Sequence, residues 1–85
     1  MNRKLLRIKA ATLQTRGTSG AFYMVERIDN VLEEREGDSV VHTAKHPEFR
    51  LASSHRAVNL NPDHTLTIVG TGEVLRVLSP GELVQ

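Results

Sequence analysis

The sequence predicts one small α+β domain, in which an amphipathic helix at about residues 20–36 packs on a mostly antiparallel sheet of four to five strands. Three observations predict this fold class. The chain has 85 residues, enough for a single domain (residues 1–85) with one hydrophobic core. Apolar residues recur every three to four positions in one stretch and with strand-like periods elsewhere. Gly- and Pro-containing segments separate these stretches, which gives the element order β-α-β-β-β(-β).

The first expected element is a strand at residues 4–13. Alternation of side chains along an extended chain predicts one buried face, made by Leu6, Ile8 and Ala10. The opposite face carries Arg7, Lys9 and Ala11. We therefore expect a strand with one apolar face and one basic face.

The helix is expected at about residues 20–36, after a Gly-rich loop at residues 16–20. Its apolar stripe follows helical spacing and consists of Ala21, Phe22, Met24, Val25, Ile28, Val31 and Leu32. Thr18 or Ser19 is suited to cap the helix N-terminus, and Gly37 is suited to end it. This stripe is the observation on which the α component of the predicted fold depends.

Strand-like patterns return after this segment. We expect a short strand at residues 38–43 and either one interrupted strand or two short strands at residues 49–60. A short helix at residues 53–58 is an open alternative. The clearest hairpin joins residues 66–69 to residues 74–78 through a turn that contains two glycines.

The composition excludes several classes of function. The chain has no cysteine, which excludes disulfides, a thiolate nucleophile and a thiolate metal site. Phe22, Tyr23 and Phe49 are its only aromatic residues, which argues against the stacking platforms that bind single-stranded nucleic acid. No stretch approaches the roughly 20 apolar residues of a membrane span. We expect a cytoplasmic protein without membrane contact.

The first 16 residues are basic, with five Lys or Arg side chains and no acidic one. Such a row is suited to phosphate groups, so Arg3, Arg7 and Lys9 are candidate contacts to nucleic acid or another anion. Arg16 joins them, because it precedes the backbone amides of the expected helix N-terminus. The competing interpretation is that these charges only keep an exposed strand soluble.

Residues 17–38 are acidic, with six Asp or Glu side chains against two basic ones. Glu26, Asp29 and Glu33 are expected on the solvent face of the helix and are candidate contacts to a basic protein surface. Charged faces of this kind are also the normal solvent side of an amphipathic helix. The second face of the small sheet needs cover, which favours a homodimer.

Catalytic and metal-binding motifs are weak in this sequence. His42 and His46 are four residues apart, but Pro47 follows and the segment has strand character, so they are not expected to share a helical face. His55 and His64 have the right chemistry for hydrolysis, yet no nucleophile motif of the form G-x-S-x-G accompanies them. We assign no catalytic residue, no metal site and no cofactor.

The sequence thus predicts a non-enzymatic cytoplasmic binding or regulatory module that acts through protein–protein contacts. One alternative is a nucleic-acid-binding accessory protein that uses the basic first strand. A second alternative is a small oligomeric enzyme with its site between subunits, because the tertiary neighbours of His55 and His64 are unknown from sequence.

Overall fold

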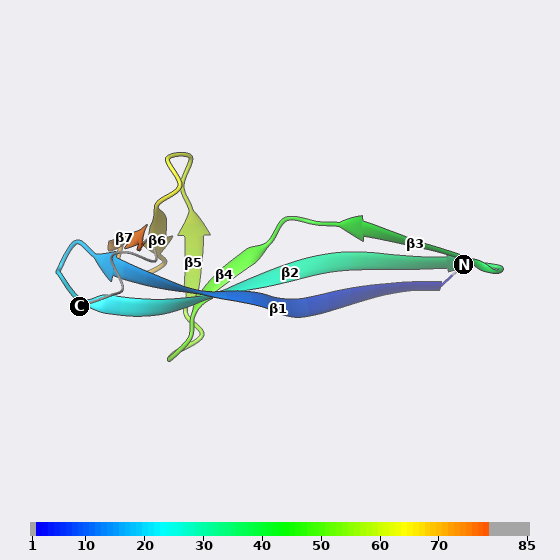
Figure 1. Ribbon diagram of the computed structural model, residues 1–85, viewed down its shortest axis with the longest axis horizontal. Helices are drawn as coiled ribbons and strands as arrows, with labels where there is room; N and C mark the ends of the chain where they lie inside the picture. The colour runs from blue at the N-terminus through cyan, green and yellow to red at the C-terminus, as the bar shows by residue number, and fades with distance from the viewer. Residues whose placement is uncertain (1, 79–85) are drawn as a thin grey trace.

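A computed structural model describes residues 2–78, which form antiparallel β-strands joined by turns (Figure 1). The strands are β1 (Asn2–Gly17), β2 (Phe22–Glu36), β3 (Ser39–Ala44), β4 (Glu48–Leu51), β5 (Ala57–Leu60), β6 (Leu66–Ile68) and β7 (Val74–Val77). The predicted α+β class is wrong, because this part of the chain contains no helix. Accordingly, no helix able to cross a membrane is found within residues 2–78.

The segment expected to be a helix is the long strand β2. It pairs with β1 on one side over almost its whole length, and with β4 and then β3 on the other side. Val25 faces the core, whereas Ile28 is buried on the opposite face of the strand. Because the buried face changes along β2, its apolar residues fall three apart and imitate a helical stripe. Pairing on both sides overrides the helical preference of its Glu, Arg and Leu residues.

Six strands close into a ring. The pairing order runs from β1 through β7, β6, β5, β4 and β2 and then returns to β1. Only the halves of β1 and β2 that adjoin the turn between them belong to this ring. In these halves, β1 pairs with β7 at Thr15–Gly17 and β2 pairs with β4 at Val25–Ile28. We call this part of the molecule the closed sheet.

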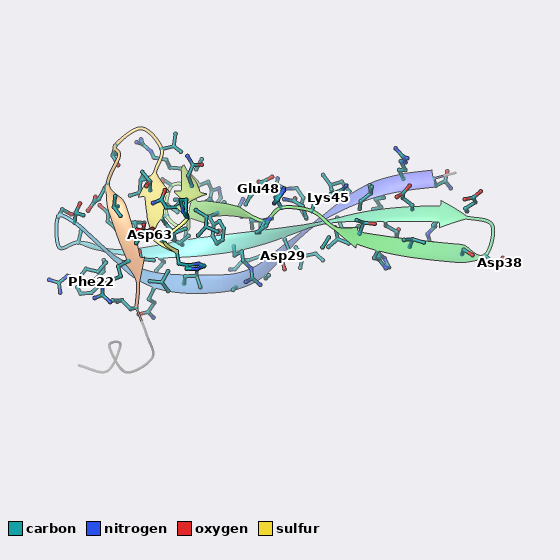
Figure 2. The ribbon with its side chains drawn as sticks, turned by 90° about the horizontal axis from the view of Figure 1, so that it is seen from above. Phe22, Asp29, Asp38, Lys45, Glu48 and Asp63 are labelled. Carbon is teal, nitrogen blue, oxygen red and sulfur yellow. The ribbon has the colours of Figure 1, made fainter. Side chains whose placement is uncertain are left out.

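The outer halves of β1 and β2 extend beyond the closed sheet together with β3. We call this three-stranded segment, residues 2–9, 29–36 and 39–44, the arm. Its tip holds Asp38, at the opposite end of the molecule from Phe22 (Figure 2). The arm makes the molecule elongated, with extents of 53 × 29 × 24 Å and a radius of gyration of 16.0 Å, against about 12 Å for a compact domain of this length.

The hydrophobic core lies inside the closed sheet. Its buried residues come from five strands and are Val25, Leu51, Val58, Leu66, Ile68 and Leu75. Leu13, Tyr23 and Phe49 pack against them from partly buried positions. The arm contributes nothing to this cluster, so the core stabilises the closed sheet and the arm depends on its strand pairing.

Several sequence-based predictions of strands are confirmed. The first strand is present and is longer than expected, residues 49–60 contain two short strands, and residues 66–78 contain the hairpin of β6 and β7. Residues 52–54 form a turn rather than the start of a short helix. The expected burial of the apolar face of β1 is wrong, because Ile8 and Ala10 are exposed. These residues belong to the arm and to the bulge that follows it.

Candidate functional site

The arm exposes aliphatic side chains on both of its faces. The strand register places Leu5, Leu32 and Val41 on one face, the Leu5 face, and Ile8 and Val40 on the other, the Ile8 face. The exposed fractions are 56% for Leu5, 57% for Val41, 50% for Ile8 and 45% for Val40. A single-layer sheet has no second layer against which to bury these groups. The arm therefore leaves apolar side chains uncovered on both of its faces. The closed sheet and its turns also expose apolar side chains, namely Phe22, Leu60 and Val69.

The two long edges of the arm differ in character. Among the described residues, β1 pairs on its second side only at Thr15–Gly17, and β3 pairs only with β2, so both edges of the arm are free. The β1 edge carries Arg3, Lys4, Arg7 and Lys9, and a bulge interrupts it between Lys9 and Ala11. The β3 edge, Ser39–Ala44, contains no Lys, Arg, Asp, Glu or Pro. Charges and bulges protect edge strands from pairing with other chains, so only β3 is left unprotected.

Three of the four predicted basic contact residues take part in ion pairs. All three lie on β1; Arg3 and Lys9 meet glutamates of β2, and Arg7 meets Glu48 of β4. The pairs are Arg3 Nε–Glu34 Oε2 (3.2 Å), Arg7 Nη2–Glu48 Oε2 (2.6 Å) and Lys9 Nζ–Glu26 Oε2 (3.1 Å). The basic row predicted from the sequence is thus on one face of β1, but carboxylates offset its charge.

Arg16 lies apart from this row, on the closed sheet. Its guanidinium lies over the ring of Phe22, 5.5 Å from the centroid, in a cation–π contact. The helix N-terminus expected beside it is absent, because residues 18–21 make the hairpin turn between β1 and β2. Gly20 allows this turn by adopting a φ of 91°.

The three acidic residues predicted to contact a partner are also paired within the chain. Glu26 and Asp29 lie on opposite faces of β2, so the single acidic helix face expected from the sequence does not exist. The contacts are Glu26 with Lys9 and Arg50, Asp29 with Arg27, and Glu33 with Arg35 and His42. Hydrogen bonds from Arg50 and Lys9 lower the pKa of Glu26, and the hydrogen bond with His42 lowers that of Glu33.

The histidines do not form a catalytic or metal-binding cluster in the described residues. His55 and His64 occupy turns, with φ angles of 60° and 69°. No group of three or more His, Asp or Glu side chains within residues 2–78 is placed to hold a metal ion. A groove of about 510 Å³ is lined in part by His46 and Glu48, but the Glu48 carboxylate is engaged by Arg7 and by the side-chain amide of Asn30.

A hydrogen-bonded cluster of Ser19, Tyr23 and Glu73 fixes the β1–β2 turn to the turn before β7. Glu73 accepts hydrogen bonds from the Ser19 amide (3.1 Å), the Ser19 hydroxyl (2.5 Å) and the Tyr23 hydroxyl (2.8 Å). Its carboxylate also packs over Gly17, where a Cβ atom would collide with it. Hydrogen bonds from Ser19 and then Tyr23 lower the pKa of Glu73, while the bond to Glu73 raises the pKa of Tyr23. The cluster has a structural role in holding two turns together.

This cluster predicts a loss of stability in acid. Because the pKa of Glu73 is lowered on folding, the unfolded chain takes up a proton at this residue first as the pH falls below the ordinary value of 4.5. Its stabilising contribution is therefore full near neutral pH and is lost in acid. Glu73→Gln should lower the melting temperature at neutral pH and make its decline in acid shallower than in the wild type.

The control for this experiment is Glu36→Gln, at the exposed end of β2. Melting curves recorded by circular dichroism from pH 7 down to about pH 3 cover the range in which carboxylates titrate. Plotted against pH, the melting temperature of Glu36→Gln should run parallel to that of the wild type. If the Glu73→Gln curve is also parallel to it, the cluster does not contribute to the acid sensitivity.

The residues that make the arm distinctive do not stand out in the sequence. Val40 and Val41 lie in the short strand expected at residues 38–43, and Ile8 was expected on the buried face of the first strand. The sequence does contain one signal for the unprotected β3 edge. The segment Ser39–Ala44 has no Lys, Arg, Asp or Glu, although Asp38 precedes it and Lys45 follows it. No family model, curated protein or solved structure matches this chain.

Proposed function

We propose that this protein is a non-enzymatic binding module that acts through protein–protein contacts and that the arm is its docking element. The observation that carries this proposal is the half-exposed state of Leu5, Ile8, Val40 and Val41 on a segment that projects from the closed sheet. Apolar surface held away from a core in this way is typical of interaction sites.

The energetics favour a partner on the arm. Complete burial of an aliphatic side chain is worth about 1.5–3 kcal/mol. Covering the exposed parts of four such residues would therefore contribute several kcal/mol, against which the entropy of association must be set. The closed sheet has its own core and does not need this contribution. Within the described residues, the arm has neither a second layer nor paired outer edges, so a partner has both apolar faces and free strand edges to contact.

The charge pattern favours a protein partner over nucleic acid. Arg3, Arg7 and Lys9 each lie within 3.2 Å of a glutamate oxygen. A phosphate group would have to compete with these carboxylates, which weakens the electrostatic attraction on which nucleic-acid binding depends. The partner we propose for the arm is therefore a protein.

The test is site-specific photo-crosslinking in living cells. A photoreactive amino acid replaces Val41 on the arm or, as the matched control, Val69, an exposed valine after β6. We expect adducts of discrete mass from position 41 and none from position 69. Wild-type protein co-expressed in excess should suppress these adducts, whereas co-expressed Val41→Asp protein should not.

Two outcomes would contradict the proposal. Equal adducts from both positions would indicate nonspecific contact, and an absence of adducts from position 41 would indicate that the arm has no partner. Adducts that disappear after nuclease treatment would instead favour the nucleic-acid alternative.

A further inference from the structure

We propose that the partner of the arm is a second copy of this chain, which pairs with the first through an antiparallel contact between their β3 strands. This inference rests on the proposed function, because it identifies the protein that the arm binds. It places His42 of each copy at the twofold axis of a continuous six-stranded sheet.

The backbone of β3 is oriented for this pairing. The Lys45 amide donates to the Asn30 carbonyl at 2.8 Å, so Lys45 directs its backbone groups toward β2. Backbone orientation alternates along a strand, which directs Thr43 and Val41 toward β2 as well. The N–H and C=O groups of Val40, His42 and Ala44 then point away from β2, and within the described residues no strand pairs with them there.

These outward groups define a symmetric register. When His42 faces His42 of the second copy, Val40 faces Ala44 of the second copy, and Ala44 faces its Val40. All three of these positions carry outward backbone groups, so each pair exchanges two hydrogen bonds. Paired residues share a face of a sheet, so the Leu5 faces of both arms lie on one side and the Ile8 faces on the other.

The charge distribution selects β3 over the other free edge. Pairing of β1 with β1 of a second copy would bring two rows of Arg and Lys together, and like charges opposite each other destabilise a sheet. The β3 pairing brings together only Ser, Val, His, Thr and Ala side chains. Each His42 imidazole lies 3.1 Å from the Oε1 atom of Glu33 in its own chain, which provides each ring with an acidic neighbour at the axis.

The symmetric pairing also limits the size of the assembly. A contact of β3 with β3 uses the same surface on both copies and therefore ends at a dimer. A contact of β3 with β1 of the next copy would leave a free edge at each end and would continue into fibres. The bulge between Lys9 and Ala11 and the charges of β1 act against this second mode.

The first experiment is sedimentation of the purified full chain over a range of concentrations. We expect a reversible equilibrium between monomer and dimer. His42→Pro removes an outward N–H, together with the imidazole and its contact with Glu33, but retains the backbone hydrogen bonds between β2 and β3, so it should weaken dimerisation at least about tenfold. Val69→Lys is the matched control, because it changes an exposed valine outside the arm and leaves the β3 edge unchanged, and its dimerisation should be close to that of the wild type.

A second measurement on the wild-type protein covers the case in which His42→Pro does not fold. Amide hydrogen exchange should protect His42 and Ala44 at high protein concentration but not at low concentration. Val41 and Thr43, which bond to β2, should show similar protection at both. An alternating pattern of this kind is specific for pairing through the outer edge of β3.

A wild-type chain that is monomeric at every concentration would overturn the inference, as would a dimer with unchanged affinity in His42→Pro. Growth into polymers with concentration would show open-ended pairing and would also overturn it. If the chain is monomeric but position 41 still forms specific adducts in cells, the arm binds a different protein and the proposed function stands. If position 41 forms no adducts, the proposed function itself fails.

Discussion

Replacing Val25 with Asp is expected to prevent stable folding of the closed sheet. Val25 is fully buried and lies on β2 between β1 and β4, where it pairs with Leu13 on one side and Leu51 on the other. A carboxylate at this position would be surrounded by apolar groups, which is among the most costly changes that one substitution can make. The expected loss exceeds about 4 kcal/mol, whereas the entire stability of a small domain is about 5–15 kcal/mol.

Met24→Asp is the matched control for this experiment. Met24 is the preceding residue of β2 and points to the exposed side of the strand. Its replacement should cost about 1 kcal/mol or less. Urea unfolding followed by circular dichroism would compare the two variants with the wild type. Similar losses for both variants would show that the burial of the two faces of β2 is wrongly assigned.

Leu75→Ala has the next largest expected effect. Leu75 is fully buried on β7, the strand that joins β1 to β6 and so closes the ring, and it lies opposite Gly17 and Leu66. Truncation of a buried leucine removes apolar contacts and leaves a cavity, at a cost of about 2–5 kcal/mol. The variant should fold at low temperature, with a clearly lower midpoint in urea.

Leu60→Ala makes the same truncation at an exposed leucine of β5. Its expected cost is about 1 kcal/mol or less, because this side chain already contacts solvent over much of its surface. The comparison therefore isolates the contribution of burial from the chemistry of the substitution. Equal shifts in the urea midpoint would contradict the placement of the core inside the ring.

Local signals in the sequence predicted the short strands well. Residues 66–78 form the expected hairpin because strand-forming residues flank a turn with glycines at both positive-φ positions, Gly70 and Gly72. Residues 49–60 also have strand-forming side chains, and a turn separates them into β4 and β5. In these segments local propensity and tertiary pairing favour the same structure, so the sequence is sufficient to predict it.

The candidate site was predicted only in part. The sequence placed Arg3, Arg7 and Lys9 on one face of a strand, and their arrangement in the structure agrees with this. It did not predict that Glu34, Glu48 and Glu26 would pair with them, because contacts between strands depend on the pairing and register of the sheet. A difference in charge between the two edges of the arm is visible in the sequence only after both edges are known.

By itself, the sequence determined the absence of cysteine chemistry, the scarcity of aromatic residues, the positions of most turns and the strand character of the first segment and of the short strands after residue 38. Only the tertiary structure decided that residues 22–36 form a strand and that a single-layer arm extends from a closed sheet. The physical reason is that the buried face of β2 changes where the closed sheet meets the arm. An amphipathic period reports the structure of a segment only when the same face is buried along its whole length.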